Sequence, residues 1–381
     1  MPARTETSLS IGIIGSGLGG LSAAISLRRA GHQVTLYERY DFGGEVGASL
    51  SVASNGSRFL EEWDINIPAA KPVILRNLIR HDYSTGQVEG TYPLGDYRER
   101  FGTDYNNFHR IDLHNHLKEV ALSNSGKGCP AVLKTWHKAS KLEPETGRIT
   151  FENGTQATHD AIICADGIRS MMRQQLGIIP QFVPSTSCCY RCIIYADKLR
   201  ELGLEEFINN NAIEFWGGDT KTKIVLSAWL DPKLITLFLN AEDIKMWRLY
   251  NHDPYPYWTK GRCTLLGDAA HPMMPDQSQG ACMAIEDAGA LGILFSEKYS
   301  DLTVEERLKL YEAERKPRAT RIQEASKRAR ENLDERIGWS SKNTKPGMLT
   351  IDEVCGYDMY SHIAGLVADL NASATKVEAS S

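Results

Sequence analysis

The stretch Ser10–Gly20, SIGIIGSGLGG, decides the fold class. Its β-branched beginning, Ser10–Gly15, predicts a short buried strand of a parallel sheet. Apolar residues at helical spacing follow over Leu18–Ala30, and Gly31 ends that predicted helix. Gln33–Tyr37 predicts a second strand. A strand, a helix and a strand in under 30 residues indicate a βαβ crossover.

The glycines between the first strand and the helix match the G-x-G-x-x-G pattern at Gly15, Gly17 and Gly20. The first permits a tight turn, the second lets a pyrophosphate approach the backbone, and the third lets the helix pack closely on the strand. The helix N-terminus offers free N–H groups to phosphates. Glu38 ends the second strand, where its carboxylate can accept hydrogen bonds from ribose hydroxyls. A dinucleotide site is favoured over a ligand-free turn, and both NAD and FAD fit this unit.

Composition excludes several classes of function. The chain has 381 residues, of which 42% are hydrophobic and 24% charged, and its net charge is −5. These values are typical of a globular protein of two or three domains and do not favour nucleic-acid binding. We see no signal peptide and no apolar run that could span a membrane, so we expect a cytoplasmic protein without a membrane partner. Cys189 and Cys192 form a lone C-x-x-C that we interpret as reduced strand residues, and we expect no metal site.

The rest of the chain predicts further elements. Val73–Arg80 and Val88–Tyr92 are expected to form an antiparallel hairpin. A second antiparallel sheet is predicted over Cys188–Tyr195, Ala212–Trp216, Lys223–Trp229 and Leu234–Asn240. Further elements are a helix and three buried strands, predicted over Asp112–Leu122, Ala131–His137, Ala161–Ala165 and Cys263–Leu266. Two long helices are predicted over Gln279–Phe295 and Val304–Asn332. Pro317 is expected to kink or break the second of them.

Two further motifs follow predicted buried strands. The first is CADGIRS at 164–170, and the second is LLGDAAHP at 265–272, followed by QGACMAIEDA at 279–288. Together with the N-terminal glycines, they resemble the three fingerprints of the single-component (class A) flavin-dependent aromatic hydroxylases, close to the salicylate hydroxylase and 6-hydroxynicotinate 3-monooxygenase branch. The segment HRIDL at 109–113 resembles a helix start of the same family. The resemblance extends from about Ile11 to Tyr360.

The resemblance implies an α/β fold: a Rossmann-like FAD-binding domain with an inserted antiparallel-sheet substrate domain and C-terminal helices. The expected FAD domain is discontinuous and comprises residues 1–70, 96–175 and 258–335. The substrate domain would comprise 71–95 and 176–257, followed by a C-terminal helical segment (336–370) and a disordered tail (371–381).

The resemblance also implies the chemistry. NADH or NADPH would reduce FAD, and O₂ would then form a flavin C4a-hydroperoxide that hydroxylates a phenolic or heteroaromatic small molecule. One form of this reaction is a decarboxylative hydroxylation, as in salicylate hydroxylase. Alternatives are a tailoring monooxygenase of polyketide or other secondary metabolism, and a non-catalytic FAD-binding protein. A flavin oxidase or halogenase is disfavoured, because no halogenase-like tryptophan motif is present. A monomer or a homodimer is expected.

The resemblance assigns a set of cofactor-binding residues. Asp268 would accept from ribityl hydroxyls, and the helix start at Gly280 and Ala281 would face the pyrimidine edge of the flavin. Asp166 would touch FAD, although a helix-capping role is the alternative for it and for Asp268. The whole implied set is Gly15, Gly17, Gly20, Glu38, Arg39, Gly47, Ala48, Arg110, Asp166, Asp268, Gly280 and Ala281.

The resemblance also implies one catalytic residue. Tyr190-Arg191 resembles the family's Y-R strand, so Arg191 would bind a substrate phenolate or carboxylate, unless it is an outward-facing strand charge. Ser51 stands where the hydroxynicotinate enzymes place a histidine, which disfavours hydroxynicotinate as substrate. The chain is also short between Leu237 and Trp258, where relatives carry an extra strand, helix and loop. A natural deletion or a lost exon would each account for this difference.

Overall fold

A parallel sheet forms the centre of the molecule. The computed structural model describes residues 8–41, 49–181, 183–216 and 231–378. Its six-stranded sheet has the order β16-β17-β12-β1-β2-β8, in which all pairs are parallel except the one between β16 and β17. The bounds of these strands are β1 Ser10–Ile14, β2 Gln33–Tyr37, β8 Val132–Lys134, β12 Ala161–Cys164, β16 Thr259–Lys260 and β17 Cys263–Leu265. The predicted βαβ unit is therefore confirmed.

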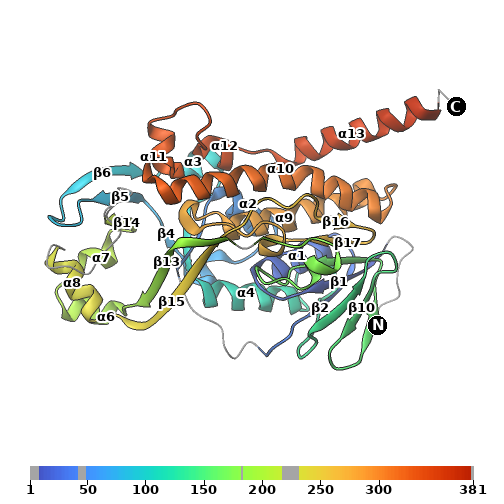
Figure 1. Cartoon of the computed structure of the whole chain (residues 1–381), viewed down its shortest axis with the longest axis horizontal. Coiled ribbons are helices and arrows are strands. Elements are labelled where there is room, and N and C mark those ends of the chain that lie inside the picture. Colours follow the sequence, from blue (N-terminus) through green and yellow to red (C-terminus); the bar gives the residue numbers. More distant parts are fainter. Residues whose placement is uncertain (1–7, 42–48, 182, 217–230, 379–381) are drawn as a thin grey trace.

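Helices cover this sheet and pack closely on one another (Figure 1). The main ones are α1 Leu18–Arg29, α4 Arg110–Leu122, α9 Gly280–Leu294 and α10 Val304–Glu331. α9 contacts α1, α2 (Ser54–Glu62) and α10. Gly289 of α9 faces the ring of Phe59 in α2, where a Cβ would come within 2.5 Å of a ring carbon. α9 is thus the buried axis around which the other helices are arranged.

Smaller sheets surround this centre. One has the order β3-β7-β4, and another has the order β11-β10-β9. Their bounds are β3 Ser49–Val52, β4 Val73–Ile74, β7 Asn106–His109, β9 Ala139–Glu143, β10 Arg148–Phe151 and β11 Gln156–Thr158. The short helix α3 Tyr97–Phe101 precedes β7 in the chain, and α5 Met172–Gln175 follows β12 and contacts β9. β3 contacts α9, so this sheet lies beside the N-terminal part of that helix.

The second region of the chain, residues 71–95 and 176–257, is built differently from the prediction. The expected hairpin is confirmed, because β5 and β6 pair antiparallel. However, β14 joins them parallel to β5, and β13 pairs with β15 in a separate two-stranded ribbon. The segment predicted as a strand over Lys223–Trp229 lies outside the described residues. The bounds are β5 Asn77–His81, β6 Val88–Pro93, β13 Val183–Ile193, β14 Ala212–Trp216, β15 Glu242–Asn251, α6 Ala196–Glu201 and α7 Glu206–Asn209.

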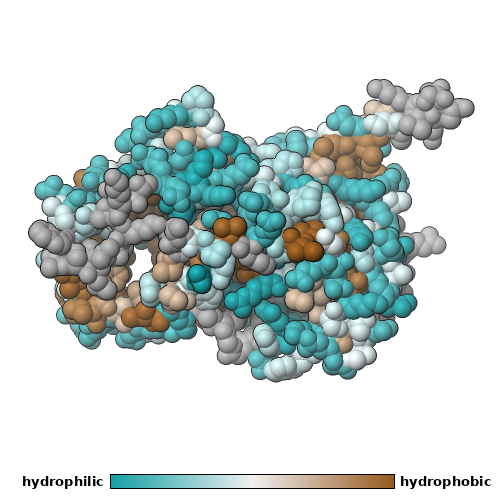
Figure 2. Space-filling view, viewed as in Figure 1, coloured by the Kyte–Doolittle hydropathy of each residue, from teal (hydrophilic) through white to brown (hydrophobic). Residues whose placement is uncertain are grey.

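The strand predicted over Leu234–Asn240 is wrong, because α8 spans Pro232–Leu239. The carboxylate of Asp231 accepts a hydrogen bond from the backbone N–H of Lys233 at 2.8 Å, and proline occupies the first turn. This cap and proline start a helix despite the β-branched residues. Figure 2 shows apolar side chains gathered over α6 and α8, where Leu239 is 80% exposed.

The C-terminal part is more helical than expected. α10 continues through Pro317 without ending, although this proline removes one backbone hydrogen bond. Buried residues on both sides of the proline, such as Tyr311 and Ile322, hold the helix against the core. α11 Ile337–Lys342, α12 Ile351–Cys355 and α13 Met359–Glu378 follow. Residues 371–378, expected in a disordered tail, therefore belong to a helix that packs on α10.

Membrane-spanning helices and metal clusters are both absent from the described ranges. None of the helices there is both long and apolar enough to cross a bilayer. No cluster of three or more metal-ligating side chains occurs in that same part of the chain.

The close contact between α9 and α2 generates a prediction about stability. Gly289→Ala places a methyl group against the buried Phe59 ring, so we expect a loss of ~1–3 kcal/mol in the free energy of unfolding. Gly365→Ala in α13 is the matched control, since its Cβ would meet nothing within 4 Å, and we expect a gain of ~0.5–1 kcal/mol. Urea denaturation measures both values. Equal effects of the two substitutions would contradict the packing described here.

Candidate functional site

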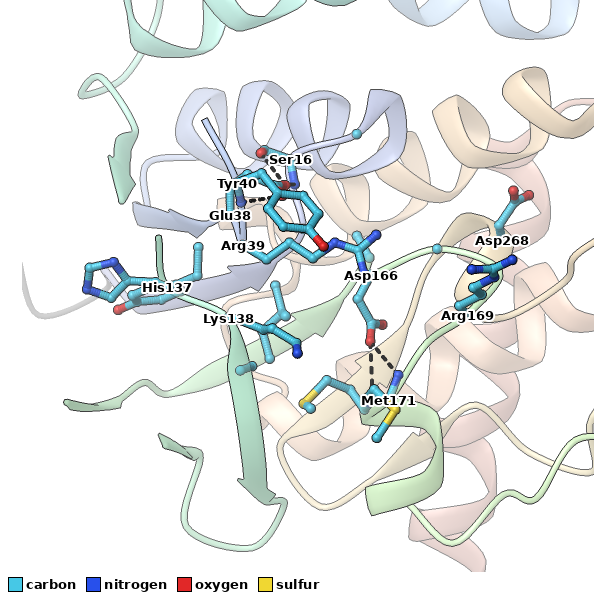
Figure 3. A pocket seen from close by; sticks show the side chains of 18 of the residues that line it. Ser16, Glu38, Arg39, Tyr40, His137, Lys138, Asp166, Arg169, Met171 and Asp268 are labelled. Carbon is cyan, nitrogen blue, oxygen red and sulfur yellow. Dashed lines mark hydrogen bonds between the residues drawn. The ribbon is translucent and has the colours of Figure 1, made fainter. Parts of the chain in front are cut away.

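A cavity of about 890 Å³ opens at the carboxyl edge of the parallel sheet (Figure 3). Strand register creates it: Ile14 pairs with Tyr37 and with Cys164, and Cys164 pairs with Leu265. Four strands therefore end at the same level, and the loops that follow them meet there. The predicted site residues that line this cavity are Gly15, Gly17, Glu38, Arg39, Arg110, Asp166, Arg191 and Asp268.

The glycine turn between β1 and α1 has the geometry that its sequence predicts. Gly15 has φ +98°, and a Cβ there would lie 2.4 Å from the carbonyl oxygen of Ala165. At Gly20 a Cβ would lie 2.0 Å from the carbonyl oxygen of Gly15, so the helix backbone packs directly against the turn at this position. A Cβ at Gly17 would meet nothing within 4 Å. The fold therefore needs the first and third glycines, whereas the second leaves room for a ligand.

Glu38 is held beside this turn. Its Oε2 accepts hydrogen bonds from the backbone N–H of Ser16 at 3.0 Å and from the Ser16 hydroxyl at 2.8 Å. The fully buried His114 donates from Nε2 to the Ser16 carbonyl at 2.8 Å. His114 therefore supports the glycine turn from the buried side. The carboxylate is thus oriented before any ribose arrives.

Asp166 lines the cavity and holds the beginning of a helix, which is the alternative role that its motif left open. Its Oδ2 accepts hydrogen bonds from the backbone N–H groups of Met171 and Met172 at 2.9 and 3.1 Å, at the beginning of α5. Its Oδ1 is buried and has no hydrogen-bond partner among the described residues. Burial raises the pKa of this carboxyl, against the lowering effect of its hydrogen bonds. One oxygen therefore stabilises the local structure, whereas the other is buried without a hydrogen-bond partner among the described residues.

Asp268 follows β17 and lies at the end of the cavity opposite Glu38 (Figure 3). Its side chain opens onto the cavity, yet desolvation by the surrounding protein raises its pKa, and His271, Arg110 and Arg173 partly offset that rise. A carboxylate with this environment gains from hydroxyl donors on a ligand. Arg110 begins α4 and also lines the cavity, where a guanidinium can pair with phosphate oxygens.

Arg191 reaches the cavity from the β13–β15 ribbon. Its guanidinium carbon lies 5.5 Å from the centre of the Trp247 ring, which also lines the cavity. Trp247 pairs in register with Cys189, so the indole and Arg191 share one face of the ribbon. Sequence analysis did not select Trp247 as a site residue, and the pairing of β15 with β13 brings it to the cavity. The same extended strand keeps Cys189 and Cys192 apart, and both are free thiols, as predicted.

Other predicted residues lie elsewhere. Gly280 and Ala281 form the first turn of α9 and are not among the lining residues of this cavity. Gly47 and Ala48 lie outside the described residues. Sequence reasoning also missed four lining residues outside the motifs, namely Tyr40, His137, Lys138 and Met171. It assigned no role to Arg169 either, although this residue belongs to the CADGIRS motif.

Comparison with known proteins agrees with this geometry. A family model described as an FAD binding domain matches residues 239–326, and one described as FAD dependent oxidoreductase matches residues 10–166. Hispidin-3-hydroxylase of Neonothopanus nambi is 32% identical over 83% of this chain and 87% of its own length. A 6-hydroxynicotinate 3-monooxygenase of Bordetella bronchiseptica is 28% identical over 92% of this chain and 96% of its own length.

A solved structure supports the same assignment at the level of the fold. A salicylate hydroxylase in complex with its substrate superimposes with a TM-score of 0.71, at 20% identity, over 94% of this chain and 98% of that one. The two matched segments belong to flavin-binding families, and residues of both segments line the cavity. The chain therefore belongs to the FAD-dependent monooxygenases that hydroxylate aromatic compounds, and it is an oxidoreductase with FAD as its cofactor.

Proposed function

We propose that this chain hydroxylates a small phenolic or heteroaromatic compound whose ionised oxygen binds Arg191. The observation that carries this proposal is the presence of Arg191 and Trp247 in the same cavity as Asp166 and Asp268. A cation beside an indole suits a flat anionic ring, because the guanidinium attracts the oxygen while the indole packs on the ring.

The cavity also fits FAD. Gly17 leaves space for a pyrophosphate, and Arg110 supplies a cation to it. Glu38 and Asp268, at opposite ends of the cavity, would accept from the ribose and the ribityl hydroxyls. Bound FAD supplies hydride uptake and the activation of O₂. The wider set of FAD contacts, including Arg39, Gly20, Gly47, Ala48, Gly280 and Ala281, is part of this proposal.

Arg191 would contribute to the chemistry through charge. A guanidinium stays protonated throughout the catalytic pH range, so it stabilises a phenolate relative to the neutral phenol. A phenolate ring is richer in electrons and reacts more readily with an electrophilic oxygen. The contact with Trp247 orients the guanidinium toward the cavity and shields one of its faces from water.

The finer points of the proposal concern substrate and partners. The named relatives act on hispidin and on 6-hydroxynicotinate, and others are FAD-dependent monooxygenases of Aspergillus candidus and Diaporthe leptostromiformis. Their variety favours a tailoring hydroxylation, and a decarboxylative hydroxylation is the second candidate because of the salicylate hydroxylase fold. We further propose NADH or NADPH as the reductant, a monomer or homodimer, a cytoplasmic location, and the domain division given above.

The role of Gly17 can be tested separately from folding. Gly17→Ala should leave the melting temperature of the FAD-free protein unchanged, because its Cβ would meet nothing within 4 Å. It should weaken FAD binding by about tenfold or more, since a methyl group intrudes where the backbone approaches the pyrophosphate. FAD titration followed by flavin fluorescence measures this. Gly20→Ala is the contrasting variant and should destabilise the FAD-free protein itself.

The role of Arg191 predicts a change in substrate binding. Arg191→Met removes charge-assisted hydrogen bonds worth ~1.5–3 kcal/mol, so the dissociation constant of an anionic aromatic ligand should rise about 10–100-fold. FAD binding should not change. Arg200→Met is the control, because Arg200 pairs with Asp197 on α6 and does not line the cavity. Equal ligand affinity in the wild type and in Arg191→Met would remove Arg191 from the site.

The function itself is tested by anaerobic stopped-flow reduction of the FAD-loaded protein with NADH or NADPH. The panel comprises hispidin, salicylates, hydroxynicotinates and resorcinols. We expect one compound to accelerate flavin reduction by orders of magnitude and to yield a hydroxylated product once O₂ is admitted. If no compound changes the rate of flavin reduction and no hydroxylated product forms, the proposal fails.

A further inference from the structure

A buried cluster of four charged side chains joins α9 to α10. Two consecutive acids of α9, Glu286 and Asp287, face Arg315 and Arg318 of α10. Arg315 donates from NH1 to Glu286 Oε2 at 2.6 Å and from Nε to Asp287 Oδ1 at 2.9 Å. Arg318 holds Glu286 with two bonds of 2.7 and 2.8 Å. Glu286, Asp287 and Arg315 are at most 2% exposed, so Arg315 links two carboxylates away from water.

Asp287 connects this cluster to the turn that carries Asp268. Its Oδ2 accepts hydrogen bonds from the backbone N–H of Gly267 at 2.9 Å and from Nε2 of His271 at 2.6 Å. These two donors lie on either side of Asp268 in the sequence. Burial alone would raise the pKa of Asp287, but His271 and Arg315 outweigh it and lower the pKa. Asp287 is therefore a carboxylate that fixes both ends of the Asp268 turn.

Glu286 connects the same cluster to the beginning of α9. Asn55 donates to Glu286 Oε1 at 2.7 Å and to the side-chain oxygen of Gln279 at 2.9 Å. Gln279 is the residue immediately before the first turn of α9, Gly280 and Ala281. Arg315 also approaches the carbonyl oxygen of Met283 in that first part of the helix, at 3.5 Å. The position of the helix start thus depends on Glu286, through Asn55.

We infer that Arg315 is a positioning residue that holds the Asp268 turn and the N-terminus of α9 in one fixed relation, and that this relation favours reduced over oxidised flavin. The inference rests on the proposed placement of the flavin between these two elements. Reduction adds negative charge to the flavin ring, and a helix N-terminus stabilises that charge only when it is correctly placed. Arg315 touches neither element's ligand-facing groups, so it acts through Glu286 and Asp287.

Arg315→Lys tests this inference. Lysine keeps the charge, but its compact ammonium lacks the planar fork that binds both carboxylates. We expect the affinity for reduced FAD, relative to oxidised FAD, to fall about tenfold, which shifts the two-electron potential by about 30 mV to more negative values. The potential is measured by equilibration with a reference dye, and the FAD dissociation constant is measured by titration of the FAD-free protein. Arg315→Met should shift the potential further.

Arg321→Met is the matched control. Arg321 lies on the same helix, but it pairs with Glu353 and is partly exposed. The two-electron flavin potential of the FAD-loaded Arg321→Met variant should equal that of the wild type. If both Arg315 variants keep the wild-type potential while only their melting temperatures fall, Arg315 is merely structural and the inference is overturned. These readouts need no aromatic substrate, so failure of the proposed function, with FAD bound and no hydroxylation, is distinguishable from failure of this inference.

Discussion

The parallel register of β1 with its two neighbours is the constraint on which the rest of the molecule depends. Ile14 pairs with Tyr37 on one side and with Cys164 on the other, so three chain segments end at one level. The turn at Gly15 then contacts the carbonyl of Ala165 closely enough to exclude any side chain. A one-residue slip of any of these strands would reverse which of its side chains face each side of the sheet and would separate the loops that form the cavity.

Two carboxylate residues that line the cavity are also held by the fold around it. Asp166 uses one oxygen to hold the beginning of α5, and its other oxygen is buried without a partner among the described residues. Glu38 is oriented by Ser16, which His114 holds from the buried side. A capping role and a place in the cavity wall are therefore compatible for Asp166, and the capping role alone does not argue against the proposed contact with FAD.

The sequence predicts the parallel sheet and most of the cavity because local signals there agree with the global fold. A strand end, a glycine and a helix follow one another in the sequence around Gly15, Asp166 and Asp268. Each of these three motifs can therefore be recognised from adjacent residues alone. The second region lacks such agreement. α8 contains β-branched residues but starts as a helix because of Asp231 and the proline after it. The pairing of β14 with β5, more than 100 residues apart, has no local signal.

The same limit applies to residues that act through tertiary contacts. Trp247 reaches the cavity only because β15 pairs with β13, and Arg315 meets Asp287 only because α10 packs on α9. Neither residue belongs to a motif. Pro317 illustrates the converse, since the helix-breaking tendency of proline is local and the packing of α10 overrides it.

The central strand has a consequence for how the protein is made. β1 leaves the ribosome early, but its partner β12 begins at Ala161, about 150 residues later in the chain. At a synthesis rate of ~5–20 residues per second, the delay is roughly 8–30 seconds. During that interval a strand destined for the middle of a sheet has a free apolar edge, which is prone to aggregation. Correct folding of this architecture therefore depends on the speed of translation through the first half of the coding sequence and on chaperone binding to the nascent chain during that time.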